Sequence, residues 1–208
     1  MLEAIRFVFF SSIEYLAIFA LMLSIFRLKP LEYIGTASFV FLIMSLISFA
    51  LRAEFDLSFV VPVVGAISYI LVLATIVRIP LLWSSIIAVS GLFIYGIIQG
   101  LIILTFFGSY TSSMQYSSTG TLIQIISIII TLGICYVLNY FKFGFVADFE
   151  KFKFKFEHIV IVVFTSLALI VVSILMYYNN LFYIIIFLLL LAGIFIYYSV
   201  LKERTAYD

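Results

Sequence analysis

Apolar residues in this chain fall into seven long stretches, which short polar or charged segments separate. The stretches cover residues 4–26, 31–51, 57–77, 81–107, 121–141, 159–178 and 181–201. Each has about the 20 residues that a helix needs to cross a bilayer, where a helix can satisfy its own backbone hydrogen bonds. Turn-forming residues such as Pro30, Pro80 and Asn179 mark the breaks. The pattern predicts an all-α integral membrane protein, a bundle of about seven transmembrane helices forming a single polytopic domain over residues 1–208.

The composition supports a membrane protein and argues against a nucleic-acid partner. Of the 208 residues, 66% are apolar and only 10% are charged, whereas about a quarter of the residues of a soluble domain are charged. The net charge is +1, and the cations lie in short segments that form no extended basic face. The surroundings expected for this chain are therefore the lipid bilayer.

The Lys and Arg residues are divided unequally between the two predicted sides of the membrane. Cations in short loops favour the cytoplasmic side. With the N-terminus outside, only Arg6 and Arg52 face outward, and nine cations face the cytoplasm: Arg27, Lys29, Arg78, Lys142, Lys151, Lys153, Lys155, Lys202 and Arg204. We therefore predict a multi-pass protein of the cytoplasmic (plasma) membrane, with an outer N-terminus and a cytoplasmic C-terminus.

The longest predicted cytoplasmic loop, residues 142–158, contains alternating cations and aromatic residues. The alternation has a period of two, which on a strand would place Lys on one face and Phe on the other. We therefore predict a short β-hairpin between the fifth and sixth helices, with one arm over residues 142–146. Its second arm would anchor the loop in anionic lipid or, alternatively, contact a partner. The predicted contact residues are Lys151, Phe152, Lys153, Phe154, Lys155 and Phe156.

On the outer side, the only sizeable predicted loop covers residues 107–120. It contains no charged residue but many hydroxyl groups and two tyrosines, Tyr110 and Tyr116. An ordinary polar connector explains this composition. The alternative is contact with an uncharged or amphipathic ligand.

Glu14 lies near the middle of the first stretch. An ionised carboxylate in hydrocarbon is costly unless it is paired or neutralised, so this side chain is expected to face the bundle interior or a wet cavity. Its role is either functional or that of an interhelical hydrogen bond.

Two later stretches carry small and polar residues at helical spacing. They are Ser84, Ala88, Gly91, Tyr95 and Gln99 in the fourth, and Gly120, Gln124, Ser127, Thr131, Cys135 and Asn139 in the fifth. Such stripes let helices pack closely and form hydrogen bonds in a bilayer, so the first interpretation is a pair of packing seams. The alternative is a ligand-binding pocket, open from the outer half, that is lined by Glu14, Tyr95, Gln99 and Gln124.

No catalytic or metal-binding motif is present in the sequence, and no cofactor is predicted. A nucleophile–base pair of Cys135 and His158 is unattractive, because Cys135 lies inside an apolar stretch where a thiol stays protonated. We therefore expect a protein that is not an enzyme.

The layout of the chain resembles a known class of bacterial sensors. Seven spans, an uncharged outer loop and a last helix that runs into Tyr197-Tyr198-Ser199-Val200-Leu201-Lys202-Glu203-Arg204 resemble the membrane sensor half of peptide-pheromone receptor histidine kinases of the accessory-gene-regulator type. Residues 48–58 and the Phe/Lys segment are also similar to small membrane proteins of spore-forming Gram-positive bacteria. After Leu201 only seven residues follow, without the kinase's phosphoacceptor and ATP-binding parts.

This resemblance implies a protein that receives or modulates a signal across the membrane through a partner, such as a separate histidine kinase or another membrane protein. Two alternatives stay open. One is a substrate-capture or transport subunit with its site at Glu14, and the other is a structural or immunity-type membrane protein without a small ligand.

Overall fold

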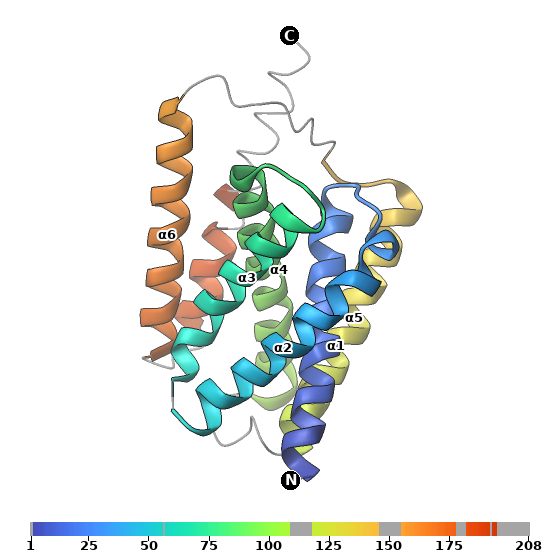
Figure 1. Cartoon of the computed structure of the whole chain (residues 1–208). Coiled ribbons are helices and arrows are strands. Elements are labelled where there is room, and N and C mark those ends of the chain that lie inside the picture. The colour runs from blue at the N-terminus through green and yellow to red at the C-terminus, as the bar shows by residue number, and fades with distance from the viewer. Residues whose placement is uncertain are drawn as a thin grey trace.

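The computed structural model describes a helical bundle over residues 2–55, 57–108, 118–145, 155–177, 182–191 and 193–194 (Figure 1). Its long helices are α1 (Leu2–Ile25), α2 (Ile34–Ala53), α3 (Val61–Thr75), α4 (Leu81–Phe107), α5 (Ser118–Phe141) and α6 (Lys155–Tyr177). Short 3-10 helices at Pro30–Glu32 and Ser58–Val60 precede α2 and α3. A further apolar helix, Phe182–Leu191, follows α6.

The predicted helical fold is confirmed, and part of the predicted set of spans is supported. Within the described residues, five helices are long and apolar enough to cross a membrane: those over Ala4–Ile25, Ile34–Ala53, Ser58–Thr75, Leu81–Phe107 and Thr119–Phe141. Two shorter apolar helical segments, Thr165–Leu175 within α6 and Phe182–Leu191, lie where the sixth and seventh spans are predicted. Seven crossings stay a prediction.

The predicted β-hairpin is not confirmed. Residues 142–145 contain a turn and a bend but no strand, and Lys155 and Phe156 are the first two residues of α6. Residues 146–154, which include Lys151, Phe152, Lys153 and Phe154, lie outside the described part of the chain. The helical hydrogen bonds of α6 extend back into the Lys/Phe segment, so the local period of two does not set the structure at its end.

Helices α1 and α4 form the centre of the bundle. α1 packs against α2, α4 and α5, and α4 also contacts α3 and α6. The most buried side chains belong to the second half of α1 and the first half of α4, and include Phe19, Leu21, Leu23, Ile87 and Val89. Gly91 permits this close contact, because a Cβ atom there would lie only 2.3 Å from Cγ of Met22.

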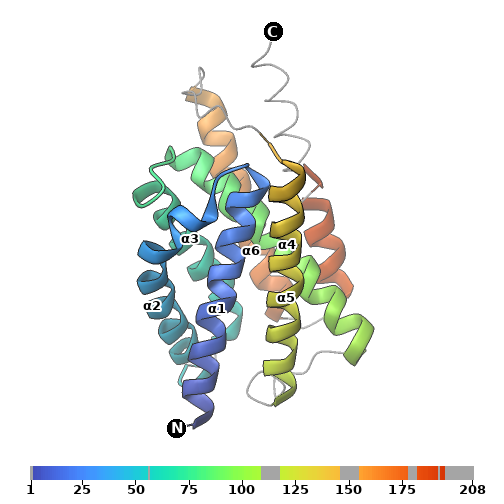
Figure 2. The ribbon, with the colours of Figure 1, turned by 90° about the vertical axis from the view of Figure 1, so that its right-hand side faces the viewer.

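Successive helices run in alternating directions, as the two views in Figures 1 and 2 show. α1, α3 and α5 therefore begin at one end of the bundle, called here the amino end, and α2 and α4 finish there. At the opposite end, α1, α3 and α5 are followed by Arg27, Arg78 and Lys142, all of which have positive φ angles (53°, 64° and 51°). The three cations thus lie at the same end, which is the end that the positive-inside rule predicts to be cytoplasmic.

The loop after α5 is held against the end of α1. The backbone N–H of Phe145 donates to the carbonyl oxygen of Ile25 at 2.8 Å, and the rings of Phe26 and Phe145 lie 5.8 Å apart. Gly144 has a φ of +146°, and a Cβ atom there would meet the Ile25 carbonyl oxygen at 2.5 Å. The first residues of the predicted cytoplasmic loop are therefore part of the packed bundle.

Candidate ligand cavity

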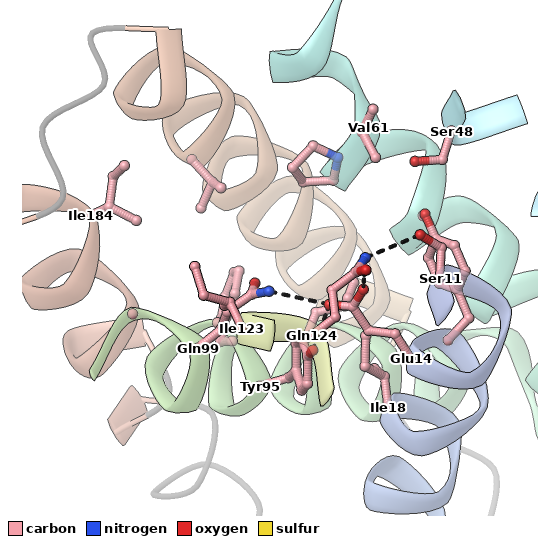
Figure 3. Close-up of a pocket in the computed structure, with 18 of the residues that line it drawn as sticks. Ser11, Glu14, Ile18, Ser48, Val61, Tyr95, Gln99, Ile123, Gln124 and Ile184 are labelled. Atoms are coloured by element: carbon pink, nitrogen blue, oxygen red, sulfur yellow. Dashed lines mark hydrogen bonds between the residues drawn. The ribbon is translucent and has the colours of Figure 1, made fainter. Parts of the chain in front are cut away.

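Glu14 accepts hydrogen bonds from three neutral side chains of two other helices (Figure 3). Its Oε1 accepts from the hydroxyl of Tyr95 at 2.5 Å and from Nε2 of Gln99 at 3.2 Å. Its Oε2 accepts from Nε2 of Gln124 at 2.8 Å, and that nitrogen also donates to Oγ of Ser11 at 3.1 Å. The carboxyl group thus links α1, α4 and α5 in the middle of the bundle.

Helical spacing explains why these side chains converge. Ser11 and Glu14 are three residues apart on α1, and Tyr95 and Gln99 are four apart on α4, so each pair lies on one face of its helix. Within an apolar bundle, a polar group that found no partner would cost several kcal/mol in lost hydration. The polar faces of α1, α4 and α5 therefore stabilise the bundle when they meet.

The Glu14 cluster borders a cavity of about 280 Å³. Its walls come from α1 to α6 and from the Phe182–Leu191 helix, and they are mostly apolar. Residues near the beginning of α1, α3 and α5 contribute, as do residues near the end of α2 and α4, so the cavity occupies the amino-end half of the bundle. The lining includes Phe7, Val61, Pro62, Ile103, Ile123 and Ile184.

A layer of packed apolar side chains lies between the cavity and the opposite end of the bundle. Phe19, Phe41, Leu73 and Ile87 in this layer are at most 1% exposed. Tyr69 is similarly buried, and its hydroxyl donates to the backbone oxygen of Tyr15 at 3.0 Å. In this conformation the cavity is therefore closed toward the end where the predicted cytoplasmic cations lie.

Arg52, near the end of α2, is the second charged residue that lines the cavity. Its guanidinium carbon lies 5.7 Å from the centre of the Phe7 ring, and its Nε atom is buried without a hydrogen-bond partner among the described residues. Arg52 is close enough to Glu14 to interact with it electrostatically. No direct ion pair between Arg52 and Glu14 is found in the described part of the chain.

The predicted polar stripes serve as packing seams over part of their length and line the cavity over the rest. Ser84 and Ala88 of α4 and Ser127 and Thr131 of α5 are fully buried. Nδ2 of Asn139 donates to Oγ of Ser24 on α1 at 3.0 Å. Toward the amino end, the same stripes place Tyr95, Gln99, Gly120 and Gln124 on the cavity wall.

Two glycines of α4 let the last described helix approach the cavity. A Cβ atom on Gly96 would lie 2.9 Å from Cδ1 of Leu188, and one on Gly100 would lie 2.8 Å from Cγ1 of Ile185. Both glycines and both aliphatic side chains line the cavity. The Phe182–Leu191 helix therefore forms a close-fitting wall of this space.

The structure brings together all four residues predicted to bind a ligand, Glu14, Tyr95, Gln99 and Gln124, at one point of the cavity. Sequence reasoning missed four polar lining residues, one of which, Tyr15, directly follows Glu14. Ser11 could have been found from its spacing of three from Glu14, whereas Ser48 and Arg52 lie one helical turn apart at the end of α2. The charge pattern predicts Arg52 only as an outer charge, because its position in the chain does not reveal that α2 turns it inward.

The donor atoms of the cavity suit an organic ligand better than a metal ion. Within the described residues, no group of three or more His, Cys, Asp or Glu side chains could hold a metal. The glutamine amides also direct their NH₂ groups, rather than their oxygens, toward Glu14. A mostly apolar cavity with a few convergent polar groups is typical of a small-molecule site.

Comparison with protein-family models, curated proteins and solved structures found no match to this chain.

Proposed function

We propose that this chain is a non-enzymatic, multi-pass membrane protein that receives a small ligand from the outer side of the cytoplasmic membrane and passes the signal to a partner protein. The observation that carries the proposal is the cavity beside Glu14, where three helices supply hydrogen bonds and all the described long helices supply walls. Because those helices share one space, a ligand there can favour one arrangement of the bundle over another. A change of state requires that the ligand bind the two arrangements with different affinity.

The closed side of the cavity favours reception over conduction. The buried layer around Phe19 and Ile87 separates the cavity from the end where Arg27, Arg78 and Lys142 lie. A receptor needs only one open side, whereas a channel needs a continuous path. The resemblance to sensor halves of receptor histidine kinases agrees with this choice, and the partner would be a separate histidine kinase or another membrane protein.

The cavity also supports a second candidate, a substrate-capture subunit of a transporter. Such a subunit binds its substrate at one charged site near mid-membrane, and Glu14 occupies such a position in α1. The two functions share the binding step and differ in the partner, an ATPase module in the case of transport.

Ligand binding is tested by thermal unfolding of the purified protein in lipid nanodiscs, against a panel of amino acids, short peptides, sugars and neutral aromatic alcohols. We expect at least one class to raise the midpoint saturably, because a ligand present at about 100 times its Kd adds about 2.7 kcal/mol of stability. Ile184→Phe, which enlarges a wall residue, should abolish the shift. Ile186→Phe is the matched control, since Ile186 is on the same helix and 40% exposed. No shift with any class, or equal shifts in both variants, would contradict ligand binding.

The partner is tested by cross-linking in native membranes, followed by affinity purification and mass spectrometry of wild type and Glu14→Gln. Recovery of a histidine kinase in a ligand-dependent amount supports signal reception. Recovery of an ATPase module, together with loss of uptake in a Glu14→Gln variant that assembles normally, supports substrate capture instead.

A further inference from the structure

The cavity has one acidic and one basic group at different depths. Glu14 lies in the middle of α1, whereas Arg52 is the penultimate residue of α2 and lies toward the amino end. Both line the cavity, and no direct ion pair joins them within the described residues. The cavity therefore has a negative inner part and a positive outer part.

Glu14 retains the capacity to accept one more hydrogen bond. A carboxylate offers about four lone-pair positions, and three are taken by Tyr95, Gln99 and Gln124. Only Gln124 binds to Oε2, so the remaining position is on that oxygen. All three donors are neutral, which leaves the negative charge of an ionised carboxylate without a cation in contact. A ligand ammonium group supplies both the missing donor and the opposite charge.

Arg52 presents the complementary group. Its guanidinium packs near the Phe7 ring, and its Nε–H has no acceptor among the described residues. The planar guanidinium fork matches a carboxylate, which can accept two of its N–H donors. An anionic group on the ligand would therefore be bound toward the outer part of the cavity.

The size and walls of the cavity restrict the ligand further. A volume of about 280 Å³ is just below the usual range for organic ligands. Apolar side chains such as Ile123, Leu169 and Ile184 form the remaining walls. The ligand is thus a single small molecule that has an apolar part as well as two charges.

We infer that the cavity binds a zwitterionic amphiphile of about the size of one hydrophobic amino acid, with its ammonium group at Glu14, its carboxylate at Arg52 and its side chain on the apolar wall. This inference rests on the proposed function, since it names the ligand class of the same cavity. The structural basis is that the Glu14 carboxyl group and the Arg52 guanidinium line one mostly apolar space, and no direct ion pair joins them within the described residues.

The test is calorimetric titration of the protein in nanodiscs with four compounds that share the phenyl group and differ in charge. Phenylalanine has both charges, phenylalaninamide only the ammonium, N-acetylphenylalanine only the carboxylate, and 2-phenylethanol neither. A parallel leucine series covers an aliphatic side chain. The zwitterion should bind at least about tenfold more tightly than either singly charged analogue, since hydrogen bonds to charged groups contribute that much or more.

Two variants assign the charges. Glu14→Gln should weaken the binding of phenylalanine and of phenylalaninamide but leave the affinity for N-acetylphenylalanine unchanged. Arg52→Gln should weaken the binding of phenylalanine and of N-acetylphenylalanine but leave the affinity for phenylalaninamide unchanged. Glu54→Gln is the control, because Glu54 is an exposed acid just beyond the end of α2 and does not line the cavity. The wild-type series decides the matter even if a variant fails to fold.

Equal affinity for 2-phenylethanol and for phenylalanine would overturn the inference while leaving the proposed function intact. Binding of a sugar or peptide, without binding of phenylalanine or leucine, would have the same consequence. Absence of binding by every class of the wider panel would instead overturn the proposed function. The inference would also be overturned if Glu54→Gln weakened the binding of phenylalanine as much as Glu14→Gln does.

Discussion

At the scale of single residues, the Tyr95 hydroxyl provides the shortest contact of the Glu14 cluster, at 2.5 Å. Tyr95→Phe removes this donor and keeps the ring. We expect it to lower the free energy of unfolding by about 1–3 kcal/mol, the usual cost of an unsatisfied buried polar group. Thermal unfolding in nanodiscs, followed by size-exclusion fluorescence, measures the change. Tyr140→Phe is the matched control because Tyr140 is 70% exposed, and an equal loss in both variants would contradict the role of Tyr95.

Gly144 is a second residue with a specific requirement. Gly144→Ala would put a Cβ atom 2.5 Å from the Ile25 carbonyl oxygen, at a φ of +146° that side chains disfavour. We expect a loss of about 1–3 kcal/mol in unfolding free energy, as for other residues held in strained backbone regions. The same thermal assay measures it.

Gly108→Ala is the control for this prediction. Gly108 also has a positive φ, of +69°, but nothing lies within 4 Å of its hypothetical Cβ atom. The loss should therefore be smaller than at Gly144, because only the backbone conformation is unfavourable. A larger loss at Gly108 would show that the contact with Ile25 does not matter.

The polar residues of the Glu14 cluster could be predicted as a group because each gains from a hydrogen-bond partner inside the bundle. Glu14, Tyr95, Gln99 and Gln124 meet for that reason. Arg52 could not be predicted as a lining residue, since a cation near a helix end can point either outward or inward with little change in the sequence pattern. Its direction depends on how α2 packs against α1.

At the scale of helices, the contact of α1 with α4 depends on the pair Gly91 and Met22. Gly91→Ala would bring a Cβ atom to 2.3 Å from Cγ of Met22, so one helix must shift. We expect a clear loss of thermal stability. In the double variant with Met22→Ala, the loss should be smaller than the sum of the two single losses, by about 0.5–3 kcal/mol, because residues in contact are energetically coupled.

Gly133→Ala is the control for this helix contact. Gly133 lies within α5, and nothing is within 4 Å of its hypothetical Cβ atom, so alanine should be neutral or slightly stabilising there. Strict additivity of Gly91→Ala and Met22→Ala would contradict direct contact between the two positions.

The apolar stretches predicted the helices well, whereas the alternating Lys/Phe segment did not predict the start of α6. An apolar stretch of about 20 residues forms a helix in lipid because all of its backbone hydrogen bonds then lie within the segment. The Lys/Phe segment is outside that constraint, and its alternation was interpreted as a strand. Lys155 and Phe156 instead continue the helix that the following apolar residues impose.

Helix ends show a similar limit. Arg27, Arg78 and Lys142 were predicted as loop cations, and the structure adds that each has a positive φ. After α1 and α5, the N–H groups of Leu28 and Phe143 close the helix end onto the carbonyls of Leu23 and Leu138, at 2.9 and 3.0 Å. Glycine is the usual residue at such positions, so an arginine or lysine there does not predict this turn. A cation there gains from the negative end of the helix dipole.

At the scale of the whole molecule, function depends on which side of the membrane the cavity faces. The cavity occupies the amino-end half, together with Arg52, whereas Arg27, Arg78 and Lys142 follow the helix ends on the other side. The positive-inside rule then predicts that the cavity faces outward. An inverted protein would present the same cavity to the cytoplasm and could not receive an external ligand.

Two glutamates at opposite ends of α2 allow a matched test of this orientation. Glu54→Cys and Glu32→Cys, each in a Cys135→Ala background, introduce a thiol at an exposed site without altering any Lys or Arg. An impermeant thiol reagent applied to intact cells should label Glu54→Cys and should label Glu32→Cys only after permeabilisation, because the charge bias places α2 with its end outside. The reverse pattern would place the cavity on the cytoplasmic side and would exclude reception of an external ligand. Labelling of both sites in intact cells would contradict a membrane-spanning α2.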